Sequence, residues 1–248
     1  MRPLTKTIQV EIKLLVRDLS AVLWVALPPL ALFGIGMLIP GFLDPQPDLE
    51  PAGLRLIDIY LPILLVFTLT LTATMAVPSA LATYRHQGVL RRLRTTPVGP
   101  APLLAAQLVA NLLYAAVAAT LTIVVALVVF DVAPPASWSA SALALALAAW
   151  TLFSIGLIVG AVAPSPTAAP AIGSLVWIPL MALGGLWAPR EAMPTVMRQI
   201  SDLSPTGAAV DALQHAWFGS GPAISSLLVL TVSALAFGAT AAAVFRWE

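Results

Sequence analysis

The chain has 248 residues, of which 60% are hydrophobic and 9% are charged, and its formal net charge at pH 7 is +1. Because soluble domains carry roughly a quarter charged residues, this composition excludes an ordinary soluble protein and predicts an all-α polytopic membrane protein. The chain contains no cysteine, which excludes disulfides, thiolate metal sites and cysteine catalysis.

Residues 1–19 have the pattern of an amphipathic helix, with apolar and basic residues on opposite sides of a helical wheel. We expect this helix to lie in the inner membrane interface, with its cations toward anionic headgroups. A simple cytoplasmic extension of the first span is the alternative. The apolar side consists of Leu4, Ile8, Ile12, Leu15, Val16 and Leu19, and the basic side of Lys6, Lys13 and Arg17.

Six apolar segments without any Asp, Glu, Lys, Arg or His are long enough to cross a membrane. At a rise of about 1.5 Å per residue, about 20 residues cross a hydrocarbon core of about 30 Å. We therefore predict six transmembrane helices within a single domain that covers residues 1–248. The spans are residues 20–39, 59–82, 102–130, 139–163, 168–188 and 223–245.

The basic residues predict the orientation of these spans. With both termini in the cytoplasm, nine of the twelve Lys and Arg residues lie inside and only Arg55, Arg190 and Arg198 lie outside. This arrangement is favoured because Lys and Arg in short loops are retained on the cytoplasmic side. The excess of arginine over lysine points to a GC-rich bacterium, so we expect a multi-pass protein of a bacterial cytoplasmic membrane.

Residues 189–222, between the fifth and sixth spans, are too polar to cross the membrane and too apolar for an ordinary loop. Apolar residues recur at helical spacing in residues 193–203, the Ser204-Pro205 pair breaks the run, and residues 208–218 resume it. We predict an outer re-entrant or interfacial segment with two short helices. The expected boundary aromatics are Trp187, Trp217 and Phe218.

The common catalytic and nucleotide-binding patterns are absent. The chain has no G-x-x-x-x-G-K-[ST] phosphate loop, so it does not bind ATP by that device. The spans carry no ionisable group for catalysis or for ion coupling, so we predict no enzyme activity and no catalytic residue. If the chain transports, another subunit supplies the energy. Asp211 and His215, one helical turn apart, are expected to form a surface pair rather than a metal site.

Residues 83–100 form a basic connection with four arginines within ten positions and no acidic residue. A short helix starting at Thr83 would place Val89, Leu90 and Leu93 on one side, which could enter a groove of a soluble partner. The alternative is that the arginines follow the positive-inside rule and bind lipid headgroups. The arginines are Arg85, Arg91, Arg92 and Arg94, and Thr96-Pro97 would end the helix.

The stretch GVLRRLRTTPVGP, residues 88–100, resembles the first cytoplasmic loop of ABC type-2 permeases, the export-type membrane subunits that include the daunorubicin-resistance permeases. Arg85-His86-Gln87 stands where that family usually carries glutamates, and Val89 replaces a threonine. The residues that match in register are Gly88, Leu90, Leu93, Thr96, Pro97 and Val98.

A second stretch, LGGLWAPREAMPTVMRQISDLSPTGAAVDALQ at residues 183–214, resembles the outer segment of the same family. The two stretches occur in the family's order within a six-span chain, so the resemblance covers the whole chain in outline. The matching residues are Gly185, Pro189, Met193, Pro194, Leu203, Pro205, Asp211, Ala212 and Leu213.

The resemblance implies a permease subunit that pairs with a second permease, identical or related, above two copies of a nucleotide-binding ATPase. It implies that ATP and Mg²⁺ bind in the ATPase, that this chain holds no cofactor or metal, and that lipids rather than nucleic acids surround it. The loop after the second span would be a cytoplasmic coupling helix on the ATPase, assisted by residues 8–17. The coupling residues would be Tyr84, Arg85, Gly88, Val89, Leu90, Arg91, Arg92, Leu93, Arg94, Thr96 and Pro97.

Some polar residues inside the spans have two interpretations. Thr68, Thr72, Met75 and Ser79 share one face of the second span and are candidates for a substrate path, although such hydroxyls more often bond to their own helix. Gln107 and Asn111 in the third span are candidates for the same path or for helix packing. Gly156 and Gly160 are expected to allow close helix packing, with a dimer interface as the alternative.

The uncharged spans favour a hydrophobic or amphiphilic cargo, such as a drug or a lipid-like compound, over a small ion. The function we predict from the resemblance is therefore drug or lipid efflux by an ATP-driven exporter. A non-transporting membrane scaffold or assembly factor is the main alternative. An ion-coupled secondary transporter is less favoured, because the spans lack ionisable residues.

Overall fold

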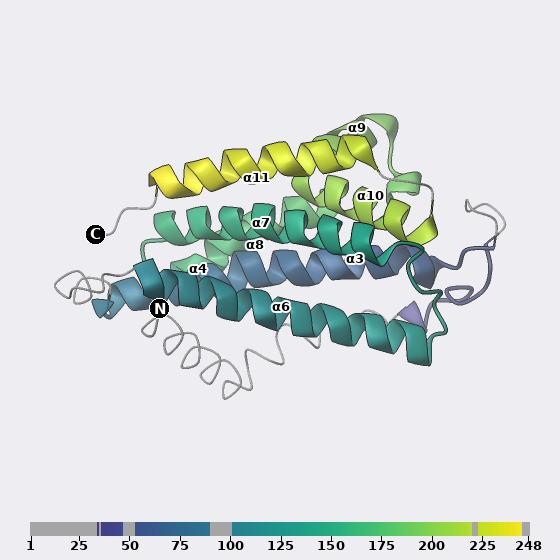
Figure 1. The fold of residues 1–248 in the computed structure, drawn as a ribbon, viewed down its shortest axis with the longest axis horizontal. Helices are drawn as coiled ribbons and strands as arrows, with labels where there is room; N and C mark the ends of the chain where they lie inside the picture. Colours follow the sequence, from purple (N-terminus) through teal and green to yellow (C-terminus); the bar gives the residue numbers. More distant parts are fainter. Residues whose placement is uncertain (1–33, 35, 47–52, 90–100, 220–222, 245–248) are drawn as a thin grey trace.

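The computed structural model describes residues 34, 36–46, 53–89, 101–219 and 223–244. The predicted amphipathic helix and most of the first predicted span lie outside these residues. Within them the fold is all-helical, as predicted, with one isolated β-bridge between Pro45 and Arg55 (Figure 1). The elements are α3 (Leu56–Leu71), η1 (Thr72–Ala76), α4 (Val77–His86), α6 (Ala101–Val129), α7 (Trp138–Val162), α8 (Ala168–Leu183), η2 (Arg190–Ala192), α9 (Thr195–Leu203), α10 (Pro205–Phe218) and α11 (Ile224–Val244).

Four helices of the described part are long and apolar enough to cross a membrane. They correspond to the second, third, fourth and sixth predicted spans. Their ranges are Leu56–His86, which joins α3, η1 and α4, and Ala105–Val129, Trp138–Val162 and Ile224–Val244.

The fifth predicted span is shorter than expected. α8 has 16 residues and ends at Leu183, whereas the sequence predicted a span to residue 188. At about 1.5 Å per residue this helix is shorter than a core of about 30 Å. Two glycines end it: Gly185 adopts a left-handed φ of 88°, and the Leu186 amide donates to the Met181 carbonyl at 3.1 Å. This is a glycine-dependent helix ending that apolar composition does not reveal.

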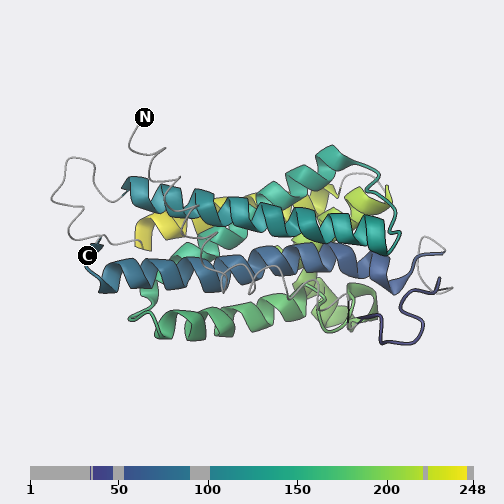
Figure 2. The same ribbon diagram turned by 90° about the horizontal axis from the view of Figure 1, so that it is seen from below.

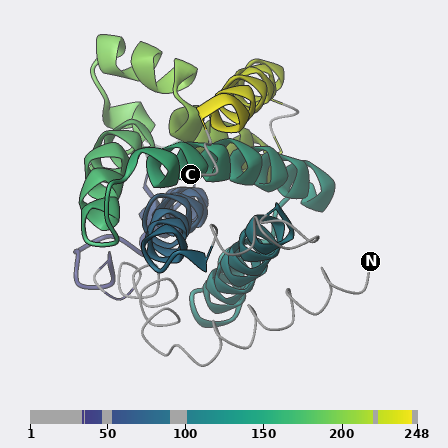
Figure 3. The ribbon, with the colours of Figure 1, turned by 90° about the vertical axis from the view of Figure 1, so that its left-hand side faces the viewer.

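The span formed by α3, η1 and α4 is the centre of the bundle. It lies between α6 and α8 in Figure 2, and α7 covers a third side in the end view of Figure 3. Of its most apolar window, 83% of the residues are buried within the chain. It carries no charged residue between Ile59 and Tyr84, as expected of a helix surrounded by protein. The largest fully buried side chains along it are Ile57, Leu61, Ile63, Leu64, Leu65, Val66 and Val77.

The predicted helices between the fifth and sixth spans differ in their surroundings. α10 is buried and packs against α7 and α3. Its Trp217, expected at a membrane boundary, is 4% exposed, and its indole donates to the Ala133 carbonyl at 2.9 Å. The acceptor of this indole thus comes from the protein, from a residue 84 positions away, and not from water or a headgroup. α9 instead exposes its apolar residues Val196, Ile200 and Leu203, as an interfacial helix would.

Candidate functional site

The first candidate site is the start of the predicted coupling segment, at the end of the bundle that carries Arg85. α4 continues the central span to His86, and Gln87 and Gly88 then form a turn in which Gly88 adopts a φ of 67°. A helix running from Thr83 through Val89 was therefore a wrong expectation. The left-handed turn requires glycine at position 88, which gives a physical reason for the residue found there.

Arg85 makes contacts within the chain. Its guanidinium donates to the carbonyl of Ala161 at 3.1 Å and to the carbonyl of Ala163. These carbonyls belong to the last turn of α7 and to its C-cap, where backbone acceptors lack helical partners and the helix dipole attracts a cation. Arg85 thereby ties the first turn of the coupling segment to the end of α7.

The remaining coupling residues are placed only in part. Tyr84 is half-buried and packs against the core, and Val89 is also half-buried. Seven predicted coupling residues lie outside the described residues: Leu90, Arg91, Arg92, Leu93, Arg94, Thr96 and Pro97.

The second candidate site is the polar face of the central span. The Thr68 hydroxyl donates to the Leu64 carbonyl, and the Thr72 hydroxyl donates to the Thr68 carbonyl, both at 2.8 Å. Ser79 donates in the same way to the Met75 carbonyl at 2.6 Å. Thr68 and Thr72 are fully buried, so in this conformation their hydroxyls satisfy their own helix and face no open path.

Gln107 and Asn111 on α6 are also buried, with 6% and 0% of their surface exposed. The Asn111 amide nitrogen donates to the Gln107 backbone carbonyl at 2.9 Å. The two side-chain oxygens, Gln107 Oε1 and Asn111 Oδ1, find no hydrogen-bond donor among the described residues. Both residues point into protein, as the sequence suggested, and within the described part of the chain both carry an acceptor without a donor.

A π-helix interrupts the central span, which the sequence analysis missed. Pro78 has no backbone N–H, so the carbonyl of Thr74 loses its usual helical donor, and the five residues of η1 widen the helix just before it. A Cβ on Gly156 of α7 would collide with the Ala73 carbonyl, and a Cβ on Gly173 of α8 would collide with the Thr74 carbonyl. Two neighbouring helices therefore touch the backbone of the π-helix through glycine.

The same contacts decide between the two interpretations of Gly156 and Gly160. A Cβ on Gly160 would lie 2.7 Å from Leu81 Cδ1 and 3.2 Å from Pro78 Cα. Both glycines pack against the central span of their own chain. Close packing within the chain is confirmed, and a dimer interface through this pair was a wrong alternative.

The opposite end of the bundle is held together by charged groups. Arg55 pairs with Asp58 at 2.9 Å and donates to the carbonyls of Phe130 and Asp131 at the end of α6. The hydrogen bonds that the Arg55 guanidinium donates to the Asp58 carboxylate raise the pKa of Arg55, so this guanidinium stays charged. The two arginines at the ends of the central span thus each bind the C-terminal carbonyls of another long helix.

Arg190 forms a second charged cluster at the Arg55 end. It is 6% exposed and pairs with Asp202 and, at 2.6 Å, with Asp211. Asp211 also accepts a hydrogen bond from Ser226 of α11 at 2.5 Å, and lies 3.5 Å from His215. The predicted Asp211–His215 pair is therefore present, and Asp211 in addition joins η2, α10 and α11 through partners distant in sequence.

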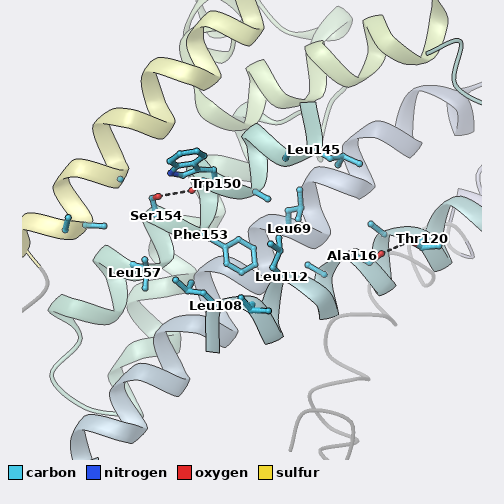
Figure 4. Close-up of a pocket in the computed structure, with 18 of the residues that line it drawn as sticks. Leu69, Leu108, Leu112, Ala116, Thr120, Leu145, Trp150, Phe153, Ser154 and Leu157 are labelled. Carbon is cyan, nitrogen blue, oxygen red and sulfur yellow. Dashed lines mark hydrogen bonds between the residues drawn. The ribbon is translucent and has the colours of Figure 1, made fainter. Parts of the chain in front are cut away.

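An apolar groove lies between α6, α7 and α11, with a volume of about 960 Å³ (Figure 4). Leu69 of α3 also lines it. Its lining contains no charged residue among those described. No local sequence pattern marks this groove, because its walls come from helices that are separated in the chain.

Comparison with known proteins gives two similarities. A family model described as "ABC-2 type transporter" matches residues 6–218. A protein of Bacillus subtilis (strain 168) named "Putative transport permease YvfS" is 24% identical over 238 residues, which cover 96% of this chain and 94% of that protein.

Proposed function

This chain belongs to the ABC-2 type transporter family, and from that premise we propose that it is the membrane-spanning permease subunit of an ATP-driven exporter. Family membership and the apolar helices make it an integral membrane protein and a transport permease. Transport is therefore favoured over the scaffold function. In the proposed exporter, two separate ATPase subunits bind ATP and Mg²⁺, and a second permease completes the path.

The observation that carries the coupling proposal is the attachment of Arg85 to α7. α4 passes directly into the predicted coupling segment, and Arg85 holds the end of α7 through the Ala161 and Ala163 carbonyls. A force applied to residues 83–100 by an ATPase would therefore act on two long helices together. The ATPase is inferred from the family, and the Arg85 contact is the route by which its movement would reach α7.

The π-helix η1 would transmit the movement of α4 to neighbouring helices. α7 and α8 touch the widened backbone of η1 through Gly156 and Gly173, so displacement of α4 would reach both helices without a flexible side chain between them. Such contacts tend to have a small number of discrete arrangements, because packed interiors resist continuous deformation. We infer that α4, η1 and α7 move as a coupled unit during the transport cycle.

The proposed orientation places both termini and the Arg85 end in the cytoplasm of a bacterium. This places the Arg55 end, with α9 and the Arg190 cluster, on the outer side. The proposed cargo is a hydrophobic or amphiphilic compound, because the described helices expose apolar rather than charged surfaces. Drug or lipid-like efflux is the process that fits this cargo.

Copurification tests the proposal. The permease is coexpressed in turn with each ABC ATPase subunit of its own genome, and the complex is isolated through a tag on the permease. Arg91→Glu combined with Arg92→Glu reverses two charges of the coupling segment, and the ATPase recovered should fall by about tenfold or more, since unpaired like charges at an interface cost several kcal/mol.

Arg198→Glu is the matched control, because Arg198 is an exposed arginine on α9 at the far end of the bundle. It should leave the recovered ATPase unchanged. Failure of the native chain to retain any ATPase would reject the exporter proposal. Equal recovery with the double variant would reject the coupling segment while leaving the family assignment in place.

A further inference from the structure

The groove between α6, α7 and α11 has the size of a small-molecule site. Its volume of about 960 Å³ lies at the upper end of the roughly 300–1,000 Å³ typical of pockets that hold drug-sized ligands. Figure 4 shows Leu69, Leu112 and Phe153 close together in the groove, with Leu108 and Leu157 beside them. The groove is thus walled by three long helices and has an apolar floor.

The groove has few polar groups, and they differ in whether their donor hydrogen already makes a hydrogen bond. Ser154 donates its hydroxyl hydrogen to the Trp150 carbonyl at 2.8 Å, and Thr120 donates to the Ala116 carbonyl at 2.7 Å (Figure 4). The Trp150 indole N–H has no acceptor among the described residues. It is therefore the hydrogen-bond donor that the groove presents to a ligand.

Gly238 of α11 leaves room beside this donor. A Cβ at position 238 would lie 3.4 Å from Trp150 Nε1 and 3.8 Å from Ser154 Oγ. A side chain larger than a methyl group would cover both atoms. The glycine keeps the indole nitrogen open to the groove.

The depth of Trp150 is unusual for tryptophan. α7 has 25 residues from Trp138 to Val162, so Trp150 lies at its midpoint, about 18 Å from either end at about 1.5 Å per residue. Tryptophan is enriched at membrane boundaries, where water or headgroups satisfy the indole N–H. At mid-depth the hydrocarbon chains of ordinary phospholipids offer no acceptor, so the donor would stay unpaired at a free-energy cost.

We propose that this groove binds an uncharged, drug-sized apolar molecule that carries a carbonyl or ether oxygen, and that this oxygen accepts a hydrogen bond from Trp150 Nε1. The inference rests on the proposed export function and names its cargo class. The molecule reaches the groove from the bilayer, because among the described residues two that line it, Trp150 and Leu112, are 60% and 46% exposed.

Photocrosslinking with 4-hexylbenzophenone tests the inference on the purified full-length chain in lipid nanodiscs. The ketone of this probe is a hydrogen-bond acceptor, and under ultraviolet light it attacks nearby C–H bonds. Mass spectrometry should locate saturable crosslinks on the groove faces of α6, α7 and α11. Diphenyl ether, whose oxygen accepts a hydrogen bond and which lacks the photoreactive ketone, should compete for them better than diphenylmethane, which has the same rings without the oxygen.

Two variants have matched controls in the same helices. Ala116→Trp fills the groove and should lower the saturable crosslinking at least about fivefold, whereas Val117→Trp places the same side chain on the neighbouring surface, outside the groove, and should not. Trp150→Phe removes the donor but keeps a ring, and should raise the half-saturating probe concentration about threefold to tenfold, as expected for one hydrogen bond. Trp138→Phe, also exposed on α7, should leave it unchanged.

Other occupants give other results. Unsaturable labelling that is equally strong at Leu175 on α8 would show only an ordinary lipid-facing surface and would overturn the proposal. A disulfide between two copies of an Ala116→Cys chain would show that a second permease fills the groove, which would also overturn it. Crosslinking requires no ATPase, so its failure is distinct from a failure of copurification.

Discussion

The central span and α11 have nearly the same mean hydropathy, 2.0 and 2.2, but 83% of the central window and only 17% of the α11 window are buried. Hydropathy therefore identifies segments that are removed from water. It does not show whether protein or lipid surrounds them. The difference lies in the contacts. The central span is covered on several sides, whereas α11 packs on α7 and α10 and leaves most of its surface outside the bundle (Figure 3).

The buried residues of α11 form a narrow stripe of four residues. Ser226, Leu230, Ala234 and Ala241 face the bundle. The Leu230 carbonyl also accepts a hydrogen bond from the Thr151 hydroxyl of α7 at 3.2 Å. Small residues allow this close approach. Leu228, Val232 and Leu235, on the other sides, are each at least 60% exposed. A change in the central span should consequently cost far more than the same change on the outer side of α11.

Gly156→Leu should have the largest effect. The new side chain would collide with the Ala73 carbonyl in the π-helix, and neither backbone can withdraw easily. We expect a loss of about 3 kcal/mol or more, because overpacking forces backbone shifts. Fluorescence-detected size-exclusion chromatography after heating should show little folded protein.

The control for Gly156→Leu is Ala239→Leu, which adds a similar volume to an exposed position on α11. It should leave the melting temperature within a few degrees of the native value. Equal destabilisation by both substitutions would contradict the contrast between the two regions.

Arg190→Met should have the next largest effect on stability. It weakens the attachment of α11 to the bundle and does not change the packing of the central span. Removal of the guanidinium leaves Asp211 without its cation while Asp211 still holds Ser226. We expect a loss of about 2 kcal/mol, less than for a fully buried pair, because Asp211 is 22% and Asp202 is 49% exposed. Hydrogen-exchange mass spectrometry should show faster exchange in the first turns of α11.

Arg198→Met removes an exposed arginine from the same segment and serves as the control. It should change neither stability nor exchange. If the exchange of α11 is the same in the two variants, the Arg190 cluster does not secure this helix.

Thr72→Val should have the smallest effect. The hydroxyl donates to the Thr68 carbonyl of its own helix, and valine keeps the shape of the side chain, so the expected change is at most about 1 kcal/mol. Thr231→Val on α11 removes the same kind of bond, to the Leu227 carbonyl at 2.8 Å, from an exposed site. Both variants should keep their stability and their export in whole cells. Loss of export by Thr72→Val alone, with stability unchanged, would assign Thr72 to the substrate path.

The sequence predicted three of the long helices almost to the residue. The spans expected at residues 102–130, 139–163 and 223–245 correspond to α6, α7 and α11, and each boundary differs by one residue. Hydropathy and the proline and glycine residues at the ends are enough to predict these helix boundaries, because the bilayer imposes a length on a helix independently of its neighbours. The same pattern misjudged α8, since Leu186 and Trp187 are apolar but follow the left-handed Gly185.

The candidate sites were predicted less completely, for a related reason. Gly88 and the surrounding arginines could be recognised from local spacing, but the partners of Arg85 are 76 and 78 residues away. Neither these carbonyls nor the partner of Trp217 has a distinctive sequence, because every residue has a backbone carbonyl. Pro78 was the one local signal for the π-helix, and the glycines that contact it belong to two other helices.

The sequence alone determined the membrane class, the position of most spans and the family resemblance, because hydropathy, charge and short motifs are properties of contiguous residues. Only the tertiary structure decided that the second span is the centre, that Gly156 and Gly173 touch its π-helix, and that Trp150 lines a groove between three of the described helices. Those properties depend on which helices become neighbours, and in a chain of uniformly apolar helices the choice is made by close packing and by hydrogen bonds between distant residues.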